Sequence, residues 1–175
     1  MAQLDYIVQA FTAYVDGFGK AGTGEKVSLP KLKKKTEDFR GGGMLGTRKV
    51  AMGYEALTHT CSLSAFDPQV LSKGGLYAGN KSFAYSVRGY LDGDRNATHT
   101  VVCQMRGEIT ELDSGEWDAG KKAMLKYTCD LVAVKLMIDS VTLWDIDIEN
   151  GLYPVGGVDR YTPLARRWAA NKDLT

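Results

Sequence analysis

Long β-strands are predicted by the stretch KAMLKYTCDLVAVKLMI, which runs from Lys122 to Ile138. Apolar and polar residues alternate from Ala123 to Leu131, and a period of two is typical of a strand with one buried face. From Val132 onward the apolar phase moves by one residue. Such a slip predicts a β-bulge, or a strand that leaves one buried environment for another.

The two runs before this stretch show the same alternation. Phe83 to Leu91 and Val101 to Ile109 each place apolar residues at odd positions, and the turn signal Asp92-Gly93-Asp94 lies between them. Two alternating runs joined in this way predict an antiparallel hairpin. A further short strand is expected around Trp144 to Ile148, where apolar residues alternate with carboxylates.

Helix signals are scarce. Asp67 followed by Pro68 predicts a short helix to Lys73, and Thr162 to Asn171 has a similar start and good helix formers. We therefore expect seven or eight strands and one or two short helices, arranged as a mainly β, antiparallel barrel or sandwich. With 175 residues and no composition break, residues 1–175 are expected to form a single domain.

The charge balance excludes several classes of protein. The chain has 22 basic and 21 acidic side chains and a net charge of +1. A dedicated nucleic-acid binder needs clustered positive charge, and so does electrostatic docking on an anionic membrane.

The sequence shows no signal peptide and no apolar stretch near the ~20 residues that a spanning helix needs. We expect no membrane binding.

The segments that resemble cofactor, metal or catalytic motifs lack residues or a context that those motifs require. Gly17, Gly19 and Gly22 have dinucleotide-loop spacing, but the chain continues toward another strand and not into a helix. The acidic run at Asp145 to Glu149 lacks the glycine and glutamate of a calcium loop. No Gly-x-Ser-x-Gly nucleophile motif is present. We predict no catalytic residues, no cofactor, no metal site and no enzymatic activity.

The three cysteines admit two interpretations. An odd count without close pairs does not describe a secreted disulfide framework. The first interpretation is three small buried apolar residues, and the second is a disulfide between identical subunits. The residues concerned are Cys61, Cys103 and Cys129.

A segment that reaches for another protein is predicted at Val27 to Gly46, VSLPKLKKKTEDFRGGGMLG. It reads as a strand carrying several lysines, followed by Phe39, Arg40 and three consecutive glycines. Opposite charges, an aromatic ring and a flexible hinge suit a protein contact, whereas no nucleophile or metal-ligand spacing is present.

These and other motifs resemble a known family, the major tail tube proteins of contractile-tailed bacteriophages of the P2-like FII type, also found as inner tubes of R-type bacteriocins. The similar segments are Val27–Met44, Met105-Arg106-Gly107, Glu111–Gly120, Asp145-Ile146-Asp147 and Gly157-Val158-Asp159. The resemblance covers about Phe11 to Asp159, while the C-terminal segment 160–175 and the cysteines have no match in the family pattern.

The resemblance implies a small β-barrel, similar to the type VI secretion tube protein, that assembles into hexameric rings. Stacked rings would form the inner tube of a contractile phage tail and conduct DNA into the host. The implied partners are the chain itself, the tail sheath, tape-measure, baseplate hub and tail terminator proteins, with DNA as transient cargo. The implied location is the virion tail, assembled in the host bacterial cytoplasm.

Two sets of residues follow as hypotheses. A projecting loop at residues 39–48 would stack rings through its glycine hinge and apolar anchors. A DNA conduit should not bind phosphates, so its lumen should be neutral or negative. The stacking residues are Phe39, Arg40, Gly41, Gly42, Gly43, Met44 and Leu45; the lumen candidates are Glu108, Glu111 and Asp130. The alternatives are the inner tube of an R-type bacteriocin and a small-molecule-binding β-barrel.

Overall fold

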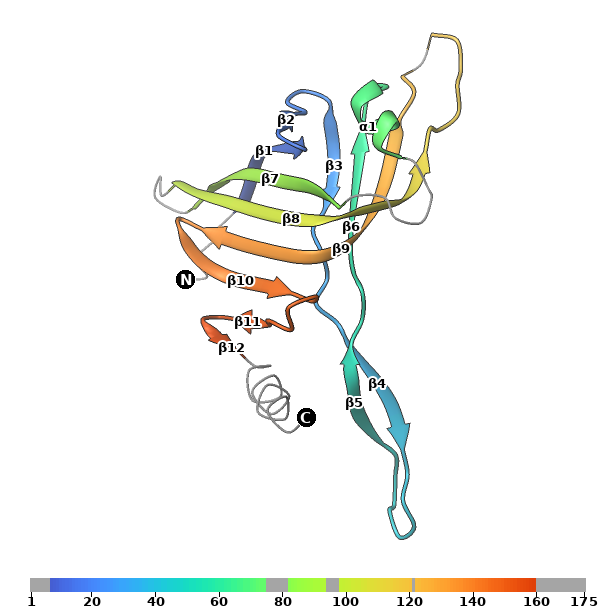
Figure 1. Ribbon diagram of the computed structural model, residues 1–175, viewed down its shortest axis with the longest axis vertical. Coiled ribbons are helices and arrows are strands. Elements are labelled where there is room, and N and C mark those ends of the chain that lie inside the picture. The colour runs from blue at the N-terminus through green and yellow to red at the C-terminus, as the bar shows by residue number, and fades with distance from the viewer. Residues whose placement is uncertain (1–6, 75–81, 94–97, 121, 160–175) are drawn as a thin grey trace, which may run out of the picture.

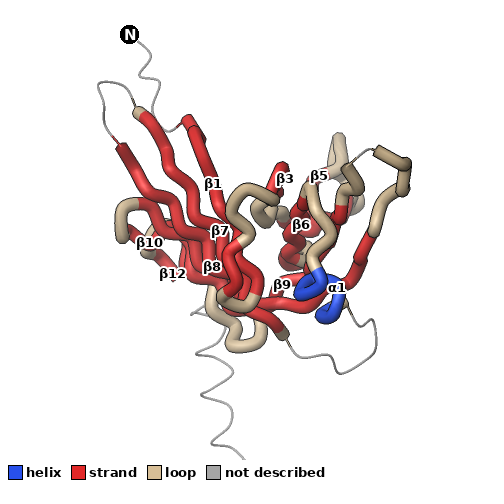
Figure 2. The backbone as a smooth tube through the Cα atoms, turned by 90° about the horizontal axis from the view of Figure 1, so that it is seen from above, coloured by secondary structure: helices blue, strands red, loops and turns tan. Residues whose placement is uncertain are grey.

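The computed structural model describes residues 7–74, 82–93, 98–120 and 122–159, which form twelve strands and one helix. Ten strands belong to one antiparallel sheet, with the order β12-β11-β10-β9-β8-β7-β1-β2 and with β3 and β6 joined to β9 (Figure 1). The sheet curls so that β3 contacts β1, which makes a partly closed barrel (Figure 2). The expected mainly β, antiparallel fold is confirmed.

The barrel begins with a tight hairpin. β1 (Ile7–Val15) turns through Asp16 and Gly17, both with positive φ, into the short β2 (Phe18–Gly19). An Asp-Gly pair with two positive φ angles matches the right-handed twist of hairpin strands. The chain then enters β3 (Gly24–Ser28), so the glycines at dinucleotide-loop spacing form turns ahead of a strand, as expected.

The hairpin of the two alternating runs is confirmed. β7 (Phe83–Asp92) pairs with β8 (Thr98–Asp113) along its whole length, from Phe83 opposite Gly107 to Asp92 opposite Thr98. Odd-numbered side chains such as Tyr85 and Cys103 enter the core.

The phase slip in the third run corresponds to both predicted features. β9 (Leu125–Ile138) contains a bulge, because Arg106 of β8 lies opposite Ala133 while Gly107 lies opposite Leu131, which leaves Val132 unpaired in the register. Up to Leu131 the other edge of β9 pairs with β6 (Leu57–Leu63), and from Ala133 onward it pairs with β10 (Val141–Asp147). One strand therefore belongs to the barrel and to a lateral extension of the sheet.

The extension continues through β10 to β11 (Pro154–Val155) and β12 (Val158–Asp159). Asp139 and Ser140, again with positive φ, form the turn between β9 and β10. The Asp139 carboxylate accepts a hydrogen bond from the backbone N–H of Thr100 at 2.8 Å. This bond ties the turn to the beginning of β8.

The stretch Val27 to Gly46 differs from the prediction of one strand followed by a loop. β3 ends at Ser28, the next five residues are irregular around the buried Pro30, and β4 (Lys34–Phe39) begins a separate two-stranded sheet with β5 (Arg48–Tyr54). The residues of this stretch do not reveal the break, because strand-forming residues do not report which sheet a strand joins. The projecting element is thus a hairpin, longer than the predicted loop at 39–48.

Helix α1 (Pro68–Lys73) has the predicted start, with the Asp67 carboxylate accepting from the backbone N–H of Gln69 at 2.9 Å. The second expected helix, Thr162–Asn171, and the C-terminal segment 160–175 lie outside the described residues. In the part of the chain that the structure describes, no helix combines the length and apolar character needed to cross a membrane.

The core lies between β1, β6, β7, β8 and β9. Its largest enclosed side chains include Tyr85, Tyr127, Leu63 and Leu125. His59 of β6 is also buried, and its Nδ1 lies 3.0 Å from the carbonyl oxygen of Ser28. Burial lowers the pKa of His59 and favours its neutral ring. The ring N–H donates to the carbonyl oxygen of Ser28, so both buried polar groups have a hydrogen-bond partner.

Candidate assembly surfaces

The β4–β5 hairpin extends away from the barrel along the long axis of the molecule (Figure 1). All of β4 is solvent-exposed. The backbone N–H of Glu55 donates to the carbonyl of Lys33 at 2.9 Å and closes the base of the hairpin, while the ring of Tyr54 stacks on that of Tyr153 at 4.1 Å and joins this base to the segment before β11. A hairpin with so little packing in its own subunit is not stabilised by the core.

The tip of this hairpin gathers the predicted stacking residues. Gly41 to Met44 forms a turn in which the Met44 N–H donates to the Gly41 carbonyl at 3.2 Å, with Gly43 at a φ of 82°. Leu45 is fully exposed, and the ring of Phe39 is half-exposed beneath the guanidinium of Arg48. The tip therefore offers apolar side chains and positive charge to a partner, which is the composition of an interface anchor.

A second surface is the polar face of the sheet formed by β7, β8, β9 and β10. The three lumen candidates lie together on this face: Glu108 is directly opposite Asp130, and Glu111 is opposite Thr128, whose hydroxyl donates to it at 3.1 Å. Arg106 and Lys135 pair with Glu149 and Asp145 at 3.0 and 3.1 Å. In the described part of the chain, neither Glu108 nor Asp130 forms an ion pair with a cation.

Carboxylates outnumber cations on this polar face, as the register of the strands shows. The cations are Arg88, Arg106, Lys126 and Lys135; the carboxylates are Asp92, Glu108, Glu111, Asp113, Asp130, Asp145 and Asp147. The face therefore carries a net negative charge.

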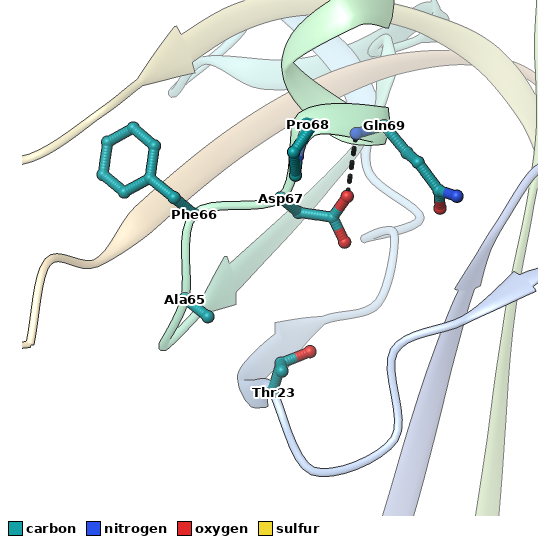
Figure 3. A pocket seen from close by; sticks show the side chains of 6 residues that line it. All are labelled: Thr23, Ala65, Phe66, Asp67, Pro68 and Gln69. Carbon is teal, nitrogen blue, oxygen red and sulfur yellow. Dashed lines mark hydrogen bonds between the residues drawn. The ribbon is translucent and has the colours of Figure 1, made fainter.

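A third surface lies at the end of the molecule opposite the hairpin. There Phe66 and Trp117 meet edge to face with ring centroids 5.0 Å apart. A shallow cavity of about 460 Å³ lies beside Phe66 and is lined by the start of α1 and by Thr23 (Figure 3). This surface was not predicted from the sequence, although a tryptophan within an acidic segment, Trp117, was a signal for it.

Asp67 fixes the wall of that cavity. Its carboxylate caps α1 and forms an ion pair with the buried ammonium of Lys20, which also donates to Gln69 Oε1 at 2.9 Å. Burial alone would raise the pKa of Asp67, but the hydrogen bonds from Lys20 and from two backbone N–H groups hold it below its usual range. The ion pair joins α1 to the turn after β2.

A fourth feature is a groove of about 780 Å³ at the base of the hairpin, between Tyr54 and the segment Ile148 to Tyr153. Asp130, Asp147 and Glu149 line it together with apolar side chains. Among the described residues, no group of three or more His, Cys, Asp or Glu is placed to hold a metal ion.

The cysteines are buried, which confirms the first of the two interpretations. Cys61, Cys103 and Cys129 are all free thiols in the core. Burial raises the pKa of the Cys103 and Cys129 thiols to about 12. A thiol enclosed in this way cannot meet one from a second subunit unless the barrel opens, so the proposed inter-subunit disulfide has no support from the geometry.

Comparisons with known proteins identify the family to which the sequence is similar. The sequence model of the family described as "Phage tail tube protein FII" matches residues 5–167. The chain is 32% identical to the tail tube protein of Escherichia phage P2, over 87% of this chain and 91% of the relative. It is 31% identical to the major tail tube protein of Serratia phage KSP20, over 88% of this chain and 90% of that protein.

Two solved structures share the fold. One is the sheath/tube terminator of an extracellular contractile injection system called PVC, with a TM-score of 0.55 and 16% identity over 74% of this chain and 94% of the other. The second is the sheath–tube complex of the same system, with a TM-score of 0.53 and 15% identity over 75% of this chain and 88% of the other.

Proposed function

Because the chain belongs to the phage tail tube protein FII family, we propose that copies of it close into hexameric rings that stack into the inner tube of a contractile tail. The family consists of structural components of the virion tail and not of enzymes.

The β4–β5 hairpin is proposed to join successive rings, and its exposed apolar tip is the main observation in support. The hairpin exposes Phe39 and Leu45 at its tip, while its base is joined to the rest of the subunit through the Tyr54–Tyr153 stack. An extended two-stranded arm with an apolar tip is marginally stable by itself, so a neighbouring subunit should cover it. The residues Phe39 to Leu45 are then the contact between successive rings.

Ring closure needs two different edges that fit each other. In the described residues, the outer edge of β1 before Ala13 has no strand partner. The beginning of β10 pairs with β9 on one edge, but its outer edge at Val141 and Thr142 has no strand partner. Both edges expose apolar residues, with Val8 59% and Val141 63% exposed. Pairing of these edges between neighbouring copies would bury both and continue the sheet around the ring.

The polar face that carries Glu108, Glu111 and Asp130 is assigned to the lumen. Its excess of carboxylates would let DNA pass without being held. The tail sheath would surround the tube, the tape-measure protein would occupy its lumen during assembly, and the baseplate hub and tail terminator would close its ends. The same tube would serve an R-type bacteriocin, and the genes that neighbour this one distinguish the two particles.

Electron microscopy of the concentrated protein tests the proposal. We expect the wild-type chain to form hollow tubes in negative stain, and deletion of Gly41 to Met44 to leave folded subunits or rings that do not elongate. Lys26→Ser, an exposed change on the barrel strand β3, is the control and should elongate normally. Normal tubes from the deletion variant would refute the role of the hairpin. A wild-type protein that stays monomeric and binds a small molecule would favour the rival binding barrel.

A further inference from the structure

The end of the molecule opposite the hairpin presents an aromatic pair without cover. Trp117 is 75% exposed, and its only ring contact among the described residues is the edge-to-face contact with Phe66. Exposed tryptophan is costly in a free subunit and is enriched among the residues that dominate the binding energy of protein interfaces. The cavity beside Phe66 gives this pair a concave neighbour that can receive a protruding side chain (Figure 3).

The charge around this pair complements that of the hairpin. The segment Glu111 to Asp118 surrounds Trp117 with carboxylates and contains no Lys or Arg. The hairpin Lys34 to Tyr54 has an excess of cations. Its cations are Lys34, Lys35, Arg40, Arg48 and Lys49, against Glu37 and Asp38. Opposite potentials of this kind steer two surfaces together and fix their orientation.

The positions of the two surfaces suit a head-to-tail contact. Along the long axis the hairpin occupies one end, while α1 and the segment after β8 occupy the other (Figure 1). Subunits stacked in one direction bring the hairpin end of each copy to the opposite end of the next. The groove at the hairpin base is a weaker candidate for the receptor, because Tyr54 and Tyr153 place it at the end from which the hairpin projects.

We propose that the surface formed by Phe66, Glu116 and Trp117 receives the β4–β5 hairpin tip of a second copy of this chain. This inference rests on the proposed stacking of rings and names its receptor. Leu45 or Met44 packs against the aromatic pair, and Arg40 lies close to Glu116. Each ring then presents hairpin tips at one end and receptor surfaces at the other, so rings can be added to the stack without limit.

Crosslinking between introduced cysteines tests the contact directly. Leu45→Cys combined with Glu116→Cys keeps Trp117 in place, and a short bismaleimide should convert assembled tubes into a ladder of multimers on a denaturing gel. The native thiols are buried and should not react. Each single variant should give no ladder. Leu45→Cys combined with Leu152→Cys probes the groove at the hairpin base and should also give none.

Charge reversal supplies a second readout. Glu116→Lys should raise the concentration needed for elongation by about tenfold or more, as expected for the loss of one interface anchor. Arg40→Glu in the same chain should restore elongation. Tubes without a Leu45–Glu116 ladder, or a ladder from the Leu45–Leu152 pair instead, would overturn this receptor while the stacking function stands. Absence of wild-type tubes would instead refute the proposed function itself.

Discussion

Gly107 of β8 lies so close to Asp130 of β9 that a Cβ atom at position 107 would stand 2.9 Å from the carbonyl carbon of Asp130 and would overlap its oxygen. This approach occurs at the bulge where β9 passes from β6 to β10. Because Gly107 has no side chain, β8 can approach β9 closely at the point where β9 passes from the barrel to the lateral extension.

We predict that Gly107→Ala lowers the free energy of unfolding by about 3 kcal/mol, because backbone atoms must move to admit the methyl group. Urea denaturation of the subunit measures the change. Gly42→Ala is the matched control, since a Cβ atom there meets nothing within 4 Å. Equal midpoints for the two variants would contradict the role of the bulge.

The Lys20–Asp67 ion pair predicts an acid dependence of stability. Asn caps a helix as well as Asp does, so Asp67→Asn removes the charge and keeps the cap. The variant leaves the buried ammonium of Lys20 without its counter-ion, so its free energy of unfolding should fall by about 3 kcal/mol at pH 7. Lys20→Met added to Asp67→Asn should recover much of this loss.

The sign of the pH effect follows from the lowered pKa of Asp67. A carboxyl group whose pKa is lower in the folded state stabilises the fold above its unfolded pKa of about 3.9, and this stabilisation is lost as the pH falls through the folded value. The difference in the free energy of unfolding between wild type and Asp67→Asn should therefore be constant near neutral pH and shrink below about pH 4. A difference that persists undiminished at low pH would contradict the assignment.

Reversal of charge on the polar face tests the lumen. The double variant Glu108→Lys and Asp130→Lys exchanges one like-charged cross-strand pair for another, so the fold should tolerate it. Tubes of this variant should retain short single-stranded DNA at low salt and release it as salt increases, whereas wild-type tubes should not retain it. Glu25→Lys on the exposed face of β3 is the control. Equal retention by the control would place the effect outside the lumen.

The exposed edge of β10 should be sensitive to a charge. Val141→Lys places an ammonium where a neighbouring strand is proposed to pair, a device that natural sheets use to prevent edge association. Light scattering should then show folded subunits that do not form rings. Thr58→Lys, on a strand of the sheet with partners on both sides, is the control and should assemble. Rings from Val141→Lys would exclude this edge.

The buried thiols predict resistance to alkylation. Only the thiolate reacts, and enclosure together with a pKa of about 12 keeps Cys103 and Cys129 protonated. Native protein should show no covalent dimer on a non-reducing gel and slow labelling by iodoacetamide, while urea should expose all three thiols. A slowly migrating species from assembled tubes would restore the inter-subunit disulfide.

Local patterns were sufficient for the fold class and for the bulge in β9, because the alternation from Ala123 to Leu131 and its slip at Val132 are written in consecutive residues. The division of Val27 to Phe39 between two sheets could not be predicted, since it depends on which strands pair: Val27 lies opposite Cys61, far along the chain, whereas Phe39 lies opposite the nearby Arg48. The same reason hid the Phe66–Trp117 contact, which joins residues from separate loops. Glu108 and Asp130 stand at polar positions of two alternating runs, so their exposure could be predicted, whereas the register of β8 and β9 was needed to show that they lie side by side.

The separation of the β4–β5 sheet from the barrel has a mechanical consequence. Since Lys33 and Glu55 close the arm on itself and the Tyr54–Tyr153 stack joins it to the rest of the subunit at its base, a small rotation of the arm would leave the barrel wall unstrained. A column of such subunits would absorb bending at its joints while the bore of every ring keeps its diameter, so stiffness along the column and flexibility between its segments can be set by different residues.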